Sequence, residues 1–255
     1  MPTKAARTRA GRASVGRTPT RTAGLAGLAG LRRPGIGRPL ALLGVAALAW
    51  ALRDVPAAFG GRPTGARAER IRHSPQFSAG TFRNPASNHT QVAEASREVL
   101  WELFFHGRRR RPPRPIPVVD EPARTGGELS VVWYGHASTL VEFGGRRVLV
   151  DPVWSRRCSP CALIGPRRLH PPPVPLERLP PVDAVLISHD HYDHLDMATV
   201  RTLWRLRSVP FVVPLGVGAH LRRWGVPERR IVELDWTERV NLAGLEFVAT
   251  PARPL

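Results

Sequence analysis

The run SHDHYDH at residues 188–194 gathers three of the nine histidines of the chain and two aspartates within seven positions. Imidazole nitrogens and carboxylate oxygens are ligands that Zn²⁺ accepts. In an extended segment, side chains two residues apart point the same way, so His189 and His191 could bind one ion together. Asp193 and His194, placed after a turn, could reach a second ion. Two ions about 3.5–4 Å apart clamp a phosphoryl or acyl group and lower the pKa of a bound water, so the run predicts a hydrolytic metal site.

The elements around this run are predicted from local patterns. Apolar or alternating residues indicate strands over four ranges: 129–134, 138–143, 146–151 and 184–188. Gly144-Gly145 is a two-residue hairpin turn between the second and the third of them. Asp196 can cap a helix over residues 197–208. The run therefore lies in a loop that leads from a buried strand to a helix.

The same signals continue downstream. They indicate a strand at 211–215, a helix near 217–224, and strands at 230–236, 239–242 and 245–249. Strands that alternate with helices are typical of an α/β layer structure. The sequence contains no internal repeats.

The part of the chain before these strands differs in composition. Residues 1–39 are rich in Arg, Ala, Gly, Thr and Pro without a hydrophobic period, which predicts a disordered basic tail. Residues 40–53 hold an apolar run of thirteen residues, fewer than the roughly 20 of a membrane span. This segment fits a membrane anchor, a signal-like region or an in-plane helix, with a buried helix as the alternative. Residues 54–125 are a connecting region with one amphipathic helix at 91–106.

Charge and cysteine content limit the classes of partner. The net charge is +18, and residues 1–53 contain ten Lys and Arg but no acidic residue. Such a chain is attracted to phosphate on anionic lipid or nucleic acid, although a solvated tail would look the same. Two cysteines exclude a disulfide scaffold. We interpret Cys158 and Cys161 as loop cysteines that could pair if the protein is exported.

The spacing HxHxDH is the signature of the metallo-β-lactamase superfamily, which this sequence resembles. Longer stretches resemble the N-acyl-phosphatidylethanolamine-hydrolysing phospholipase D and its bacterial relatives: WYGHASTLVEFGGRRVLVDPVWS, GPRR, LPPVDAVLISHDHYDHLD, VPLG and VELDW. A more distant resemblance is to L-ascorbate-6-phosphate lactonases. The resemblance extends over residues 70–252. It implies an α/β fold of the metallo-β-lactamase αβ/βα sandwich type, with residues 126–255 forming the N-terminal part of that domain.

The resemblance implies a role for each matching residue. It assigns four metal ligands: His189 and His191 to one ion, Asp193 and His194 to a second. Asp193 is also the candidate catalytic residue, because it can orient the attacking water. Asp151 matches an aspartate beside the metal loop, where it would orient a ligand or cap the turn before Pro152. His136, in a Gly-His-Ala element, is expected near the pocket but not as a ligand. Zn²⁺ is the expected metal, and Fe or Mn fit the same ligands.

The C-terminal residues depart from the family pattern. The next family ligand is a His in a Thr-Pro-x-x-His run, where this chain has Pro254 after Thr250-Pro251. No histidine follows His220. We therefore expect a C-terminally truncated domain that contains the first half of the sandwich and only the start of the second. Such a chain would bind metal weakly and hydrolyse little.

These features predict a membrane-associated, metal-dependent phosphodiesterase of the phospholipase D type, with metal-bound hydroxide as the nucleophile. Its partners would be a phospholipid or another phosphodiester substrate and an anionic membrane surface. The first alternative is a metallo-hydrolase of another ester, a lactone or a nucleic-acid phosphodiester. The second alternative is an inactive truncated fragment. The sequence fixes neither the side of the membrane nor the oligomeric state.

Overall fold

The computed structural model of the 255-residue chain describes residues 37–83, 112–119, 128–161 and 163–251. The chain divides into two compact units, Met1–Leu43 and Gly44–Leu255. The predicted basic tail, apart from its last three residues, lies outside the described residues. The predicted amphipathic helix at 91–106 lies outside them as well.

Helix α1 (Gly37–Leu52) contains the apolar run and begins three residues before the predicted segment 40–53. Its abundant Ala and Leu residues favour helical backbone. Large apolar side chains on it are exposed: Leu42, Leu43, Val45, Leu48 and Leu52. Among the described residues, none of the helices combines the length and the apolarity needed to cross a membrane.

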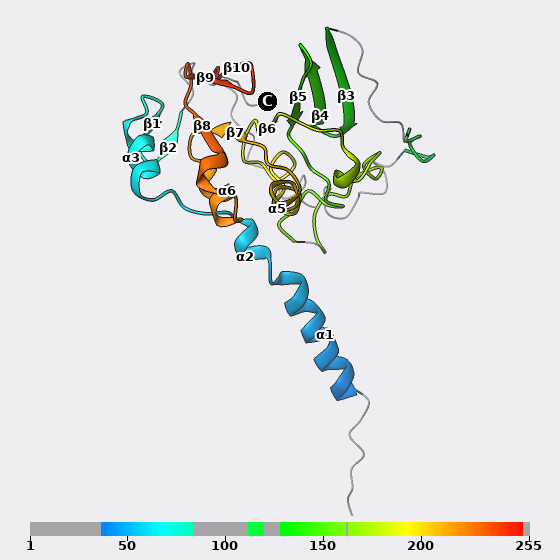
Figure 1. Ribbon diagram of the computed structural model, residues 1–255. Coiled ribbons are helices and arrows are strands. Elements are labelled where there is room, and N and C mark those ends of the chain that lie inside the picture. Colours follow the sequence, from blue (N-terminus) through cyan, green and yellow to red (C-terminus); the bar gives the residue numbers. More distant parts are fainter. Residues whose placement is uncertain (1–36, 84–111, 120–127, 162, 252–255) are drawn as a thin grey trace, which may run out of the picture. The chain divides into compact units, whose positions relative to one another are not determined.

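A six-stranded mixed sheet is the centre of the unit Gly44–Leu255 (Figure 1). Its strands are, in spatial order, β3 (Leu129–Gly135), β4 (Ser138–Phe143), β5 (Arg146–Val150), β6 (Ala184–Leu186), β7 (Phe211–Pro214) and β8 (Ile231–Leu234). Strands β3, β4 and β5 pair antiparallel, whereas β5 to β8 pair parallel. The expected α/β class is confirmed.

The hairpin between β4 and β5 follows the prediction. Phe143 lies opposite Arg146 in the register, so Gly144 and Gly145 form the whole turn. Their φ angles of 55° and 73° are both positive, as a two-residue turn that matches the strand twist requires. Glycine accepts this backbone without steric cost.

Topology places the candidate site residues at one edge of the sheet. Strands β3, β5 and β6 run in the same direction, since β4 is antiparallel to both of its neighbours. Their carboxyl ends therefore share an edge, which is where α/β sheets carry their ligands. His136 follows β3, Asp151 follows β5, and the run 188–194 follows β6.

Helices cover one face of the sheet. The helices of this layer are α5 (Met197–Leu206), α6 (Gly218–Arg223) and the short 3₁₀ turns η1 (Leu176–Arg178) and η2 (Glu228–Arg230). Leu203 of α5 and Leu221 of α6 are buried in one cluster with Leu149 and Val185 of the sheet. Asp196 caps α5 as predicted, because its side chain accepts a hydrogen bond from the Ala198 N–H at 3.1 Å.

A two-stranded hairpin covers part of the other face. It consists of β9 (Arg239–Leu242) and β10 (Leu245–Val248), which form a separate antiparallel sheet. Phe247 of β10 is buried with Val148 and Ala184, the sheet residues that alternate with those of the helical face. The large sheet is thus covered by helices on one face and in part by the β9–β10 hairpin on the other.

The predicted connecting region contributes more than a linker. Residues 54–83 form α2 (Val55–Ala58), α3 (Gly65–His73) and the strands β1 (Phe77–Ser78) and β2 (Thr81–Phe82). The Trp224 indole N–H donates a hydrogen bond to the Ala57 carbonyl at 2.8 Å. Arg67 Nε lies 2.7 Å from Glu233, which also accepts bonds from the N–H groups before α6. This segment is therefore attached to β8 and α6.

Candidate metal centre

The loop from β6 to α5 turns sharply within the histidine run. The N–H groups of His194 and Leu195 both donate to the His191 carbonyl, at 2.9 and 2.8 Å. The turn brings His194 back toward the strand end and places Asp193 at the tip of the loop. A turn was expected before Asp193 and His194, whereas in the structure both residues lie within the turn that begins at His191. Strand β6 ends at Leu186 rather than at Ser188.

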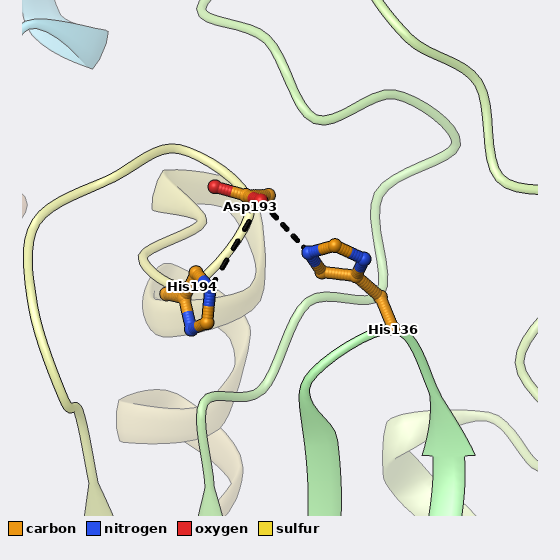
Figure 2. A group of neighbouring side chains, drawn as sticks. All are labelled: His136, Asp193 and His194. Atoms are coloured by element: carbon orange, nitrogen blue, oxygen red, sulfur yellow. Dashed lines mark hydrogen bonds and ion pairs between the residues drawn. The ribbon is translucent and has the colours of Figure 1, made fainter. Parts of the chain in front are cut away.

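Three side chains converge at this edge: His136, Asp193 and His194 (Figure 2). His136 Nε2 lies 2.8 Å from Asp193 Oδ2, and His194 Nε2 lies 3.9 Å from the same oxygen. One potential ligand atom from each residue lies within 4.8 Å of the other two. Two imidazole nitrogens and a carboxylate oxygen are a donor set that suits Zn²⁺, Fe or Mn.

His189 and His191 lie beside this group. The ring centroid of His189 is 4.0 Å from that of His194 and 4.6 Å from that of His191. Burial, followed by the charges of His194 and His191, lowers the pKa of His189. A lowered pKa favours the neutral imidazole, which is the form that binds a metal. The structure therefore gathers all the histidines of the run, although His189 and His191 are not within the three-residue group.

Asp151 contacts His194, one member of the three-residue group. Its side chain is buried and accepts hydrogen bonds from the Ser188 N–H and the Ser188 hydroxyl, each at 2.6 Å. The other contact of Asp151 Oδ2 is with His194 Nδ1 at 2.9 Å. A proton on Nδ1 that is donated to this carboxylate leaves His194 Nε2 as an acceptor, directed toward Asp193. Within the described residues, the hydrogen bonds of the Asp151 side chain are with Ser188 and His194, which fits the role of orienting a ligand rather than that of a turn cap.

The two aspartates of the run differ. Burial favours a high pKa for Asp193, but the hydrogen bond from His136 and further favourable contacts outweigh it and lower the pKa of this carboxyl. Asp193 is thus a carboxylate at neutral pH, as a metal ligand must be. The pKa of Asp190 is lowered mainly by its interaction with His220, whose Nε2 lies 3.8 Å from the carboxylate. Asp190 points to α6 and not to the three-residue group.

Comparison with known proteins agrees with this geometry. Residues 146–254, which include Asp151 and the whole histidine run, match the family described as Beta-lactamase superfamily domain. The chain contains a beta-lactamase superfamily domain. An uncharacterized protein of Mycobacterium tuberculosis H37Rv is 51% identical over 207 residues, which are 80% of this chain and 55% of that protein.

Two further relatives have names that state an activity. An N-acyl-phosphatidylethanolamine-hydrolyzing phospholipase D of Caenorhabditis elegans is 40% identical over 114 residues, 43% of this chain and 32% of that protein. A metal-dependent hydrolase of Pyrobaculum aerophilum is 28% identical over 128 residues, 49% of this chain and 50% of that protein. The chain spans about half the length, or less, of these relatives.

The glycine of the Gly-His-Ala element at residues 135–137 is required for steric reasons. Gly135 has a φ of 103°, and a Cβ atom there would lie 2.5 Å from Arg168 Nη2 and 2.7 Å from His170 Cε1. Only glycine allows this approach. His136, the next residue, also has a positive φ, and its carbonyl accepts a hydrogen bond from the Trp133 indole at 2.7 Å. The backbone of His136 is therefore held at the end of β3, and its ring contacts Asp193.

A pocket of about 620 Å³ opens beside the three-residue group. It is lined by Ile116, Trp133, His136, Cys158, Pro166, Arg167, Arg168, Leu169, His170, Tyr192 and Asp193. Burial raises the pKa of Tyr192, so its phenol stays protonated. Burial also raises the pKa of the Cys158 thiol, and both cysteines are free. The pocket is therefore lined by the candidate ligands His136 and Asp193 and by arginines and apolar side chains.

Most of this wall is absent from the residues that the sequence predicted. The run GPRRLH at 165–170 could have indicated this wall, because two arginines and a histidine follow a Gly-Pro turn in a loop. Arg168 holds this loop beside the site, because its guanidinium donates hydrogen bonds to the carbonyls of Tyr134 and Val153. These contacts join positions more than a dozen residues apart, and no local pattern indicates them.

Proposed function

We propose that this beta-lactamase superfamily domain belongs to a metal-dependent hydrolase that cleaves phosphodiesters in the manner of a phospholipase D. The observation that carries the proposal is the convergence of His136, Asp193 and His194 beside a pocket that contains Arg167. The candidate metal ligands and an arginine that could bind a phosphate therefore adjoin the same pocket.

Each residue of the group has a defined task. His136, Asp193 and His194 would hold the metal, and Zn²⁺ is the ion that their nitrogen and oxygen donors fit first. A bound ion of this kind polarises a phosphoryl oxygen and lowers the pKa of water. Asp193, being a carboxylate, can accept a hydrogen bond from the attacking water and orient it. Asp151 keeps the His194 ring in one orientation.

Two observations support a phospholipid as the substrate. The C. elegans relative is named as a phospholipase D that hydrolyses N-acyl-phosphatidylethanolamine. The pocket combines arginine with apolar side chains such as Trp133 and Leu169, which suits a phosphate next to a hydrocarbon chain. A soluble phosphodiester or a lactone would use only part of this lining.

We place the protein at an anionic membrane surface. The exposed leucines of α1 and the ten basic residues among residues 1–53 suit a segment that attaches to an anionic membrane surface. Binding to vesicles of phosphatidylcholine with and without 30% phosphatidylserine, measured by flotation, tests this placement. We expect binding that requires the anionic lipid and is lost when residues 1–53 are removed. Equal binding with and without residues 1–53 contradicts it.

The activity is tested with the soluble substrate bis(p-nitrophenyl) phosphate and with micellar N-acyl-phosphatidylethanolamine, each at saturating Zn²⁺. We expect slow turnover of both by the 255-residue chain, with phosphatidic acid as a product of the lipid. His194→Ala should reduce each rate to that of buffer with Zn²⁺. Wild-type rates equal to those of His194→Ala, including no turnover by either protein, contradict the proposal.

The control variant is Arg156→Gln, which changes an exposed arginine that does not line the pocket. Its rates should equal those of the wild type. A lactone substrate serves as the second arm, because hydrolysis of the lactone alone would assign the metal centre to another ester class. Fast turnover would refute the expectation from the sequence that these 255 residues hydrolyse little.

A further inference from the structure

The wall of the pocket opposite the histidine run is a segment with its own chemistry. It is formed by residues 155–161 and 163–170, which pair through an isolated bridge between Arg157 and Arg167. The Cys158 N–H donates to the Pro166 carbonyl at 3.1 Å, and the Arg168 N–H donates to the Arg156 carbonyl at 3.1 Å. These bonds hold Arg167 and Arg168 at fixed positions along the pocket.

We infer that Arg167 is a specificity-determining residue that binds the phosphate of an amphiphilic phosphate ester, while the hydrocarbon part of the ester lies against Trp133 and Leu169. The inference deepens the proposed function and rests on it for the place of this ester beside the metal centre. It adds that Arg167 decides which substrates bind, through hydrogen bonds to the phosphate.

The charges of the wall select an anion. Arg167 lines the pocket and is exposed, and within the part of the chain that the structure describes its side chain has no acidic partner. Arg168 adds a second positive charge beside it, because among the described residues its guanidinium donates to the neutral carbonyl groups of Tyr134, Val153 and His170 and to no carboxylate. The acidic residue that lines the pocket, Asp193, faces His136. A planar guanidinium with free N–H groups binds phosphate through paired hydrogen bonds.

The apolar part of the wall is rigid and accessible. Trp133 is 58% exposed, yet its indole N–H is fixed by the His136 carbonyl and its ring contacts His170 edge to face at 5.7 Å. Leu169 is 56% exposed and is adjacent to the arginines in the chain. Exposed apolar side chains next to fixed cations match a ligand with a charged head and a hydrocarbon tail, which a free phosphate would not occupy fully.

Binding is measured by calorimetry in EDTA, so that no metal and no turnover contribute. The probes are hexyl phosphate, inorganic phosphate and hexanol. We expect hexyl phosphate to bind at least 10-fold more tightly than either of the other two. Arg167→Gln should weaken hexyl phosphate binding about 10-fold to 100-fold, the range for hydrogen bonds to a charged group. Arg167→Lys, which keeps the charge but not the paired geometry, should lie in between.

Two matched variants separate the parts of the inference. Arg156→Gln removes an equal charge from the same loop outside the pocket and should leave the affinity within twofold. Leu169→Ser should weaken binding of hexyl phosphate but not of inorganic phosphate. Equal affinity of the wild type for hexyl phosphate and inorganic phosphate would show a site for free phosphate and would overturn the inference. Unchanged binding by Arg167→Gln, with an unchanged melting temperature, would also overturn it.

The result is independent of the test of activity. If hexyl phosphate binds through Arg167 while wild-type and His194→Ala rates are equal, the proposed hydrolysis fails and the binding site stands. If hydrolysis depends on His194 while Arg167→Gln binds hexyl phosphate normally, the inference fails and the hydrolase stands.

Discussion

His194 and His136 both face Asp193, but the protein supports them differently. The side chain of His194 is 22% exposed, and its Nδ1 contacts Asp151, whose own side chain is 6% exposed. The side chain of His136 is 48% exposed, and its ring contacts Asp193 at the loop tip. Two of the hydrogen bonds that hold Asp151 come from Ser188, so the support of His194 is part of the core.

This difference indicates that the two histidines have different roles in the candidate metal centre. His194 is fixed before any ligand arrives, because a buried carboxylate sets the direction of its ring. His136 is fixed through its backbone, by the positive φ and by the bond from Trp133, while its ring stays accessible. His194 would therefore form the preorganised side of a metal site, and His136 would form its accessible side.

The comparison is tested most strongly by removing each histidine in turn. His194→Ala should lower the affinity for Zn²⁺ at least about 100-fold, or about 2.8 kcal/mol, because the fixed ligand is lost. His136→Ala should lower it only about 10-fold, since water can replace an exposed ligand. Competition with a chromophoric chelator measures both. A larger loss for His136→Ala would reverse the comparison.

Asp151→Asn tests the buried support itself. Asparagine retains the shape but cannot accept the bonds from both Ser188 and His194, so we expect a 10-fold to 100-fold loss of Zn²⁺ affinity. The control is Asp190→Asn in the same loop, whose carboxylate faces His220 and not the three-residue group. It should change the affinity less than threefold. Equal losses would show that the loop needs charge rather than the orientation of His194.

Asp196→Ala tests how firmly the loop is attached to α5. Asp196 is buried and accepts bonds from the Ala198 and Ser155 N–H groups and from the Thr199 hydroxyl. Losing the cap should reduce the free energy of unfolding by about 1–2 kcal/mol in urea denaturation. Thr202→Ala on the same helix removes an exposed bond and should cost less than about 0.5 kcal/mol. Similar costs for both would refute a special role for the cap.

Trp133→Phe gives the smallest expected effect. It removes the hydrogen bond to the His136 carbonyl but keeps an aromatic ring, and we expect about a threefold loss of Zn²⁺ affinity from a bond worth about 0.5–1.5 kcal/mol. Trp204→Phe is the matched control, because the Trp204 indole N–H has no partner within the described part of the chain. An unchanged affinity for Trp133→Phe would show that the positive φ alone aims His136.

Local signals in the sequence predicted the strands and helices from residue 129 onward, but they did not predict the elements of residues 54–83 or the wall of the pocket. The turn at Gly144-Gly145 and the cap at Asp196 depend on neighbouring residues, so they could be predicted from the sequence. The histidine run was recognisable for the same reason. The pocket wall depends on the bond from Arg168 to the Tyr134 carbonyl, which joins residues 34 positions apart. The sequence placed His136 near the pocket and not among the ligands, whereas the structure groups it with Asp193 and His194.

The most direct test of the metal centre is a titration of the 255-residue chain with Co²⁺, followed by visible absorption. We predict intense d–d bands that saturate, that are absent in His194→Ala, and that shift but persist in His136→Ala. Zn²⁺ should displace Co²⁺ and remove the bands, since it favours the same nitrogen and oxygen donors. Bands of the same intensity in the wild type and in His194→Ala, or no bands in the wild type, would contradict a metal centre at this edge of the sheet.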